Sequence, residues 1–479
     1  MFANPDDLAR HSVETRRARI RVTRRIPQSG TVAYGETVLV LGRSQEVFMR
    51  FAQTLIGCLL FDFLAIAVTG AEPTSTVELR VGNDVHVGRV AARTSQQTWL
   101  MQRNGQLREI ELSRVKSFKQ VSPKFSPLTP MMLSTDLKRE FGADFETATT
   151  RHYVVVATKG KSKQYVELFE SVYRTFHTHF SVHGFEIDEP EFPLIAVIFP
   201  NQAAFAKYAN QEGVQIPKGL TGYYRPMSNR VALFEDGAAR PTAHRDAVEG
   251  EIWLGKSPRA GDLFGSPRDF GTIEADIRDT IIHECTHQVA FNVGMHDRMG
   301  DNPQWVVEGL ATVFEAPGIR NRANGTQVIR RINPDRFAWF KEFAKTRRKK
   351  DSLETFIGGD ELFQSNTLDA YAQAWALSFF LMETRPRKYA EFLKQTAEQG
   401  DRKSLTREKR VGMFQTAFGS DRRLFEAEFL RFYEKLKKRS KRCRECRTAP
   451  CSARKPSLGF RPLSATAGDD SSPRSVLFV

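Results

Sequence analysis

Hydrophobic and polar residues alternate over residues 77–121, as in short strands that bury one face. Four runs follow one another: VELRVG, VHVGRVAART, QTWLMQR and LREIELSRVKSF. An Asn-Gly pair between the last two is typical of a hairpin turn. The pattern therefore predicts a small all-β meander over residues 75–122, which we expect to be a passive accessory module with Trp99 in its core.

After the linker SPKFSPLTP, the pattern changes to amphipathic helices mixed with short strands. The apolar run PLIAVIFP is bounded by prolines, which is typical of a buried central strand. The other predicted elements are strands at Phe145–Thr149, Tyr153–Ala157 and Arg230–Phe234, and helices at Leu133–Phe141 and Lys163–His179. The sequence predicts an α+β protein in which the β module precedes one larger domain over residues 128–439.

The chain beyond residue 315 is mainly helical in its pattern, and residues 236–268 predict a long irregular insertion that could cover a cleft. Residues 440–479 are basic and then rich in Ser, Pro and Gly, so we expect a disordered tail. The tail cysteines Cys443, Cys446 and Cys451 lack a fourth zinc ligand nearby, which favours a disulfide or free thiols over a metal site.

The segment HECTH at residues 283–287 is an HExxH motif within an apolar helical run. Residues four apart on a helix lie on one face, so His283 and His287 can both bind one metal ion. Glu284 lies beside them, where a carboxylate can take a proton from a metal-bound water. The motif predicts a metal site with Glu284 as the general base.

A second helical run, PQWVVEGLATVFE, carries Glu308 at the twenty-first position after His287. Catalytic zinc sites use three protein ligands and leave the fourth position to water. We therefore expect His283, His287 and Glu308 to bind one Zn2+ ion. His296 and Asp297 are further ligand candidates in the loop between the two helices. The alternative is that these are ordinary residues of a partly buried helix.

The combination of HECTHQ with PQWVVEGLATVFE resembles the gluzincins, the thermolysin-like and aminopeptidase-N-like metallopeptidases with a glutamate ligand on the helix after HExxH. It resembles more closely an uncharacterised family of the peptidase MA group, frequent in planctomycete bacteria, with HExxH and a W-x-x-E-G-L-A helix. The resemblance covers residues 128–436. Thr312 stands where thermolysin-like enzymes have an Asp, and Ala290 and Val293 stand where metzincins have a Gly and a third His.

The resemblance implies a zincin-like domain that hydrolyses peptide or protein substrates. Gluzincins commonly use a Tyr or His beyond the glutamate ligand to stabilise the oxyanion, which implies this role for Tyr371. The alternative is a core Tyr whose hydroxyl is hydrogen-bonded to the backbone. It also implies an exposed edge strand beside the metal that binds an extended peptide, formed here by Asn229, Arg230, Val231, Ala232 and Leu233. An ordinary sheet edge is the alternative for the strand. A catalytically inactive peptide-binding or envelope protein on the same scaffold is the alternative function.

The formal net charge of +15 lies mainly at the ends of the chain. Residues 1–48 contain eight Arg against five acidic residues, and residues 435–455 contain ten basic residues against one acidic residue. The second run has no recognised nucleic-acid-binding motif and no interleaved aromatic residues. The charge therefore does not indicate a nucleic-acid partner.

The stretch from Met49 combines a basic residue, a short apolar run and the small residues Thr69 and Ala71 at a candidate cleavage site. The run is short for a transmembrane helix and contains a charged residue. We therefore expect a signal peptide over residues 49–71, an exported periplasmic or extracellular protein, and no stable membrane span after processing. Residues 1–48 would be untranslated or disordered. A membrane anchor or a buried helix is the alternative.

Overall fold

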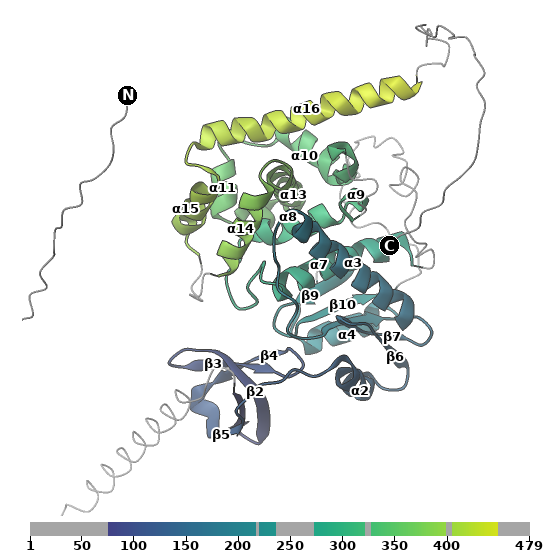
Figure 1. The fold of residues 1–479 in the computed structure, drawn as a ribbon, viewed down its shortest axis with the longest axis vertical. Coiled ribbons are helices and arrows are strands. Elements are labelled where there is room, and N and C mark those ends of the chain that lie inside the picture. Colours follow the sequence, from purple (N-terminus) through teal and green to yellow (C-terminus); the bar gives the residue numbers. More distant parts are fainter. Residues whose placement is uncertain (1–74, 217–219, 236–272, 321–326, 399–404, 449–479) are drawn as a thin grey trace, which may run out of the picture. The chain divides into compact units, whose positions relative to one another are not determined.

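The computed structural model describes residues 75–216, 220–235, 273–320, 327–398 and 405–448 (Figure 1). The predicted signal peptide, the predicted 236–268 insertion and the last part of the predicted tail lie outside these residues. No helix in the described part of the chain is both long enough and apolar enough to cross a membrane.

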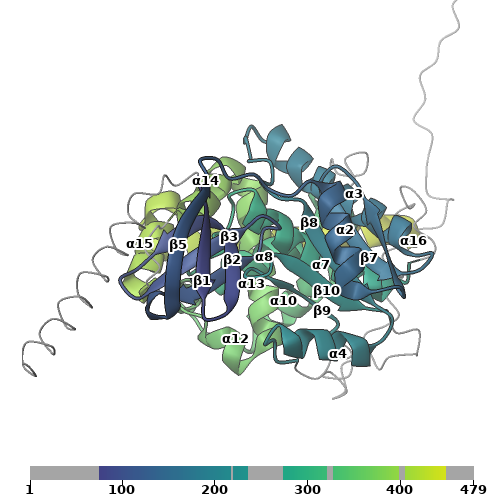
Figure 2. The ribbon, with the colours of Figure 1, turned by 90° about the horizontal axis from the view of Figure 1, so that it is seen from below.

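The N-terminal described domain is a five-stranded antiparallel sheet, which confirms the predicted all-β module. The strand order is β4-β3-β2-β1-β5, and Figure 2 shows β5, β1, β2 and β3 side by side. The strands are β1 (Thr76–Val81), β2 (Asp84–Arg93), β3 (Gln97–Gln102), β4 (Leu107–Glu111) and β5 (Val115–Ser122). Gly105 adopts a φ of 82° in the β3–β4 turn, a conformation that glycine reaches without steric cost.

Apolar packing and polar contacts, among them those of Arg298, join the module to the second domain. The apolar cluster at this junction consists of Met101, Leu107, Phe125 and Phe192. Trp99 packs against this cluster, so it lies partly buried at the junction of the two domains. The guanidinium of Arg298 donates to the carbonyl oxygens of Gly105 in the module and Pro226 in the second domain, both at 2.7 Å.

The second domain contains a mixed five-stranded sheet in the order β6-β7-β8-β10-β9. The inner strands β7 (Tyr153–Thr158), β8 (Leu194–Phe199) and β10 (Arg230–Phe234) are parallel to one another. The outer strands β6 (Phe145–Thr149) and β9 (Gly222–Arg225) are antiparallel to their neighbours. All residues of β8 and β10 are buried, as expected for parallel strands that are covered on both faces.

Helices cover the two faces of this sheet (Figures 1 and 2). The helices α2 (Pro130–Phe141) and α4 (Gln202–Gln211) form one apolar cluster with the first face. The helices α3 (Ser162–Val182) and α7 (Ala275–Asn292) form another cluster with the second face. Successive strand residues belong to different clusters because side chains alternate across a strand.

The rest of the described chain is helical. Its elements are α8 (Gln304–Phe314), α9 (Pro317–Arg320), η3 (Val328–Arg331), α10 (Pro334–Thr346), α11 (Leu353–Gly358), α12 (Glu361–Ser365), α13 (Thr367–Thr384), α14 (Pro386–Ala397), α15 (Arg407–Phe418) and α16 (Arg422–Thr448). Helices α8 and α13 approach closely at Gly309. A Cβ atom there would lie only 2.1 Å from Ser378 Oγ and 2.7 Å from the carbonyl oxygen of Ala374. Glycine is therefore required at this crossing.

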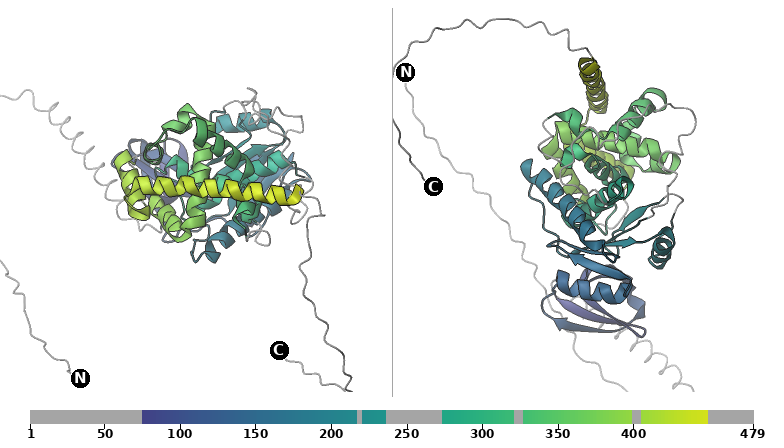
Figure 3. Two further views of the ribbon diagram at one scale, coloured as in Figure 1. Left: turned by 90° about the horizontal axis from the view of Figure 1, so that it is seen from above. Right: turned by 90° about the vertical axis from the view of Figure 1, so that its right-hand side faces the viewer.

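Helix α16 is longer than the sequence pattern predicts (Figure 3). Disorder was expected from residue 440, but the helix continues to Thr448. Residues 440–448 contain no Gly or Pro, and the Lys and Arg residues that give this stretch its charge are good helix formers. Closer to its start, α16 is anchored by Tyr433, whose hydroxyl donates to the carbonyl oxygen of Ala376 in α13 at 2.7 Å.

Candidate metal centre

Helix α7 carries the HExxH segment, and buried polar contacts fix its position on the sheet. The side-chain amide of Gln288 donates to the carbonyl oxygens of Ile195 at 2.9 Å and Asn229 at 2.8 Å. The Cys285 thiol, which is fully buried, lies 3.1 Å from the hydroxyl of Tyr153 in β7. Because these residues face the sheet, the two histidines of the motif face the neighbouring helix α8.

Helix α8 brings Glu308 close to the two histidines of α7. Most of its apolar side chains, among them Trp305 and Leu310, are fully buried. The backbone N–H of Gln304 in its first turn donates to Asp360 Oδ1 at 3.1 Å. A carboxylate at this end is stabilised by the helix dipole as well as by the hydrogen bond. Asp360 therefore fixes the start of the helix one turn before Glu308.

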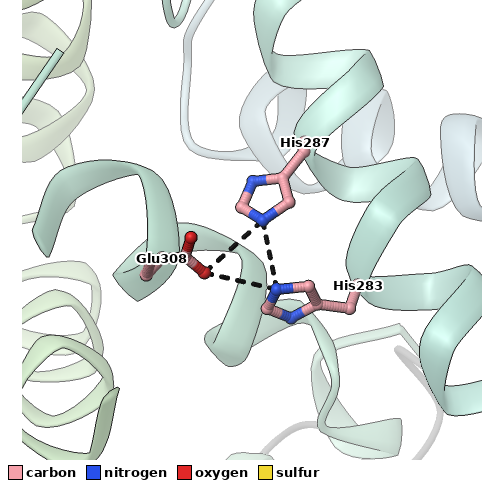
Figure 4. A group of neighbouring side chains, drawn as sticks. All are labelled: His283, His287 and Glu308. Atoms are coloured by element: carbon pink, nitrogen blue, oxygen red, sulfur yellow. Dashed lines mark hydrogen bonds and ion pairs between the residues drawn. The ribbon is translucent and has the colours of Figure 1, made fainter. Parts of the chain in front are cut away.

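Three donor atoms converge between α7 and α8: Nε2 of His283, Nε2 of His287 and Oε2 of Glu308 (Figure 4). The two nitrogens lie 3.1 Å apart, and the oxygen lies 3.3 Å from His283 and 3.5 Å from His287. Metal–ligand bonds of roughly 2.0–2.1 Å place neighbouring atoms of a tetrahedral site about 3.3 Å apart. The spacing and the donor types therefore fit a metal ion, and these three residues can hold one.

The electrostatics of this group favour a bound cation. Burial alone would lower the pKa of His283, but hydrogen bonds to Glu308 and Glu315 outweigh it and raise that pKa. Burial alone would raise the pKa of Glu308, but the charge of His287 and the imidazole hydrogen bonds outweigh it and lower that pKa. Glu308 is thus an ionised carboxylate in a buried setting, where an opposite charge is strongly stabilising.

Glu315 is a site residue that the sequence analysis did not identify. Its Oε1 accepts a hydrogen bond from His283 Nδ1 at 2.9 Å, and this contact orients the ring so that Nε2, once it gives up its proton, can serve as the ligand atom. Its Oε2 accepts a hydrogen bond from Asn333 Nδ2 at 2.7 Å. Burial alone would raise the pKa of Glu315, but the charge of Arg336 and the His283 hydrogen bond lower it to about 2. The carboxylate is ionised and orients the His283 ring.

Glu284 and Tyr371 lie beside the converging atoms but do not belong to them. Glu284 is half-buried on α7, and its negative charge acts on both His283 and Tyr371. The Tyr371 ring lies 6.4 Å from the His283 ring, measured between centroids. Burial, followed by the charges of Glu308 and Glu284, raises the pKa of Tyr371. The phenol therefore keeps its proton and can act as a donor.

The two further ligand candidates lie outside the converging group. His296 is buried with its ring 5.0 Å from that of Phe291, between centroids. Burial, aided by the charge of His287, lowers the pKa of His296 to about 3, so the ring is neutral. Asp297 is not among the converging residues: its Oδ1 accepts a hydrogen bond from the backbone N–H of Met299 at 2.9 Å, and its own backbone N–H donates to Asn302 Oδ1 at 3.0 Å. Asp297 and Asn302 shape the loop between α7 and α8.

The prediction of an edge strand at residues 229–233 is wrong. Strand β10 lies between β8 and β9, so neighbouring strands pair with its backbone on both sides. Arg230 forms a two-pronged ion pair with Glu140 at 2.5 Å and 2.9 Å, and Asn229 donates to Asn292 Oδ1 at 2.9 Å. The remaining predicted contact residues are fully buried: Val231, Ala232 and Leu233. These five residues support the sheet and are not accessible to a substrate.

The edge of the sheet on this side is β9, which pairs with β10 alone among the described strands. Strand β9 lies next to helix α7, which carries both histidines. Thr221, directly before β9, shares a hydrogen bond with Thr280 of α7 at 2.9 Å between the hydroxyl oxygens. Thr280 is one turn before His283 in the helix. The edge strand and the converging donor atoms therefore share one region of the domain.

The chain matches the model of a family described as "Protein of unknown function (DUF1570)" over residues 277–401, a region that includes all three converging residues. No curated protein matches the chain. Solved structures that match include a mutant of an M1 zinc metallopeptidase from Deinococcus radiodurans. That match has 10% sequence identity and a TM-score of 0.31, and covers 61% of this chain and 50% of the other. The chain thus spans about half the length of that structure.

Proposed function

We propose that this protein is a zinc-dependent hydrolase of peptide bonds. The observation that carries the proposal is the convergence of two imidazole nitrogens and one carboxylate oxygen at the spacing of a tetrahedral site. A His2Glu set with one position left for water is a known solution for catalytic zinc. Bound zinc would supply a water of lowered pKa and would polarise a substrate carbonyl.

Glu284 would act as the general base. It follows His283 directly, so it is turned about 100° around the helix axis from that ligand. Its carboxylate lies outside the three converging donors and is half-buried beside them. In this position it would take a proton from the attacking water and pass it to the nitrogen of the leaving amine.

Tyr371 would stabilise the oxyanion that forms when water adds to the carbonyl. It projects from α13, which packs directly on the α8 helix that carries Glu308. Its pKa is raised by burial and by Glu308 and Glu284, so its O–H remains a donor. A preorganised donor of this kind typically contributes about 10²–10³-fold to the turnover rate.

Among the described strands, β9 has a neighbour on one side only, and this edge favours a peptide as the substrate. An extended chain can add to such an edge through backbone hydrogen bonds, independently of its side chains. The hydrogen bond between Thr221 and Thr280 fixes this edge beside the helix turn that leads to His283. A peptide held there would lie along the region where the donor atoms converge.

The proposal is tested by measuring the zinc content of the purified protein and digesting a broad peptide library with it. We expect about one zinc per chain and cleavage that a chelator abolishes and added zinc restores. Zinc without cleavage would instead support an inactive peptide-binding or envelope protein. Protein that takes up no zinc would contradict the proposal.

We also propose that the protein is exported, on the basis of the signal-like stretch from Met49 to Ala71. Protein from the native host should then begin near Glu72, and residues 1–48 should be absent. Intact-mass measurement checks this expectation. A full-length product in the cytoplasm would contradict it.

A further inference from the structure

Arg336 lies between two groups of the proposed centre without being one of its metal donors. Its Cζ lies 5.3 Å from the centroid of the Tyr371 ring. Its Nη2 lies 3.5 Å from Oε1 of Glu315, and this same oxygen lies 2.9 Å from His283 Nδ1. The Arg336 guanidinium therefore contacts both the carboxylate of Glu315, which orients His283, and the ring of Tyr371, the proposed oxyanion donor.

The start of α10 holds Arg336 in this place. The side chain of Asn333 accepts a hydrogen bond from the backbone N–H of Arg336 at 3.2 Å. The amide of the same Asn333 donates to Glu315 Oε2 at 2.7 Å and to the carbonyl oxygen of Thr312 at 3.3 Å. The helix start is therefore tied to α8, and both Asn333 and Arg336 contact the Glu315 carboxylate.

The chemistry of this contact suits arginine. A guanidinium is planar, so it can lie over an aromatic ring while an N–H at its edge points to a carboxylate. A lysine ammonium is a compact, strongly hydrated charge and cannot do both. The side chains of Arg336 and Glu315 are each only 18% exposed, so solvent screens their interaction weakly.

We infer that Arg336 is a positioning residue that couples the orientation of Glu315, and through it His283, to the placement of Tyr371. The inference rests on the proposed function, because it assigns Arg336 a task in that same centre. Loss of the guanidinium would loosen two groups at once. The orientation of Glu315 and His283 affects how tightly zinc is held, and the placement of Tyr371 affects turnover.

The test compares Arg336→Lys with Arg347→Lys. Arg347 serves as the control because it directly follows α10 and, like Arg336, contacts both a carboxylate and an aromatic ring, but away from the centre. Its Nη2 lies 2.6 Å from Asp369 Oδ1, and its Cζ lies 5.7 Å from the centroid of Trp339. We expect Arg336→Lys to weaken zinc binding about 10-fold, as for loss of other partners of metal ligands. A similar loss in kcat is expected, with KM little changed, whereas Arg347→Lys should change neither.

Two double-mutant cycles separate positioning from a general loss of structure. Zinc dissociation constants are measured for Arg336→Lys, Glu315→Gln and the double variant, and kcat for Arg336→Lys, Tyr371→Phe and their double variant. Arg336→Lys should add little to either partner variant. Additive effects in both cycles, or an equal effect of Arg347→Lys, would overturn the inference.

These readouts also distinguish failure of the inference from failure of the proposed function. Wild-type protein that binds zinc but cleaves no peptide would end the proposal of hydrolysis. The affinity cycle with Glu315 would still decide whether Arg336 positions the metal residues. Wild-type protein that binds no zinc would overturn both.

Discussion

The two sides of the candidate centre are held in place by different kinds of contact. Helix α7, with both histidines, is tied to backbone carbonyl oxygens of the sheet through Gln288. Helix α8, with Glu308, is held by close packing against α13 and by polar side chains such as Asp360 and Asn333. We call α7 the sheet side of the centre and α8 the helical side, and the donor atoms meet between these two helices (Figure 4).

This difference indicates which changes should affect folding and which should affect chemistry. The carbonyl oxygen of Ile195 belongs to the inner strand β8 and that of Asn229 directly precedes β10, so neither can move without disturbing the sheet, and the histidine pair has a rigid support. On the helical side, side-chain contacts set the orientation of the donors and of Tyr371. A change of one polar group there can alter metal binding while the fold persists. The following variants separate the two sides.

The largest effect is expected for Glu284→Gln, which keeps the shape of the side chain but removes the base. Turnover should fall by about 10²–10⁴-fold, the usual contribution of general acid–base catalysis. Stability should change little because the side chain is half-buried and the amide is isosteric. Kinetics with a cleaved peptide check this, with the exposed Glu167→Gln of α3 as the control. Equal turnover in the two variants would remove Glu284 from the mechanism.

Gly309→Ala should break the packing of the helical side. The added methyl group would meet Ser378 and the backbone of Ala374, and overpacking of this kind costs about 3 kcal/mol. Gly412→Ala in α15 is the control, because a Cβ there meets no atom within 4 Å. That change should stabilise the protein by up to about 1 kcal/mol, as expected for alanine in a helix. Denaturant unfolding measures the free energy of unfolding of both variants. Equal values would contradict the packing argument.

Gln288→Leu should weaken the sheet side. Two buried carbonyl oxygens, those of Ile195 and Asn229, lose a hydrogen-bond donor, which should cost about 2 kcal/mol of unfolding free energy. Gln202→Leu at the exposed start of α4 should stay within about 0.5 kcal/mol of wild type. Zinc affinity measured under native conditions should hardly change in either variant. A Gln288 variant of wild-type stability would show that this anchor is dispensable.

Glu315→Gln should give the smallest effect, and it should act on metal binding. The amide oxygen can still accept the His283 N–H, but the negative charge is lost. Zinc affinity should therefore fall about 10-fold, at the low end for partners of metal ligands. Glu383→Gln, which removes a carboxylate paired with Arg331, is the control. Chelator competition measures the zinc affinity of both variants. An unchanged affinity in Glu315→Gln would show that Glu315 has no role in metal binding.

Local rules of sequence account for part of the centre. The histidines share a face because helix geometry fixes the direction of residues four apart. Glu315 could have been recognised, since it lies seven positions after Glu308 and two helical turns place both on similar sides. Asn333 and Arg336 reach the centre only through the packing of α10 on α8 and α13. No periodicity in the sequence reveals that arrangement.

The edge strand illustrates the same limit. The run Arg230–Phe234 has a clear strand pattern, but strand order in a sheet depends on pairings between distant segments. Strand β9, only four residues long, comes just before β10 in the chain and occupies the outer position. The hairpin was predicted from the sequence. Which of its two strands lies at the edge was not determined by their local patterns.

The most direct test of the central claim is the zinc content of Glu308→Ala and Glu284→Gln, purified and measured side by side. Glu308 supplies one of three converging donor atoms, whereas Glu284 lies beside them. Glu284→Gln should keep its zinc and lose turnover. Glu308→Ala should bind zinc more weakly by at least about one to two orders of magnitude. Zinc retained in Glu308→Ala, or lost in Glu284→Gln, would contradict the assignment of ligand and base.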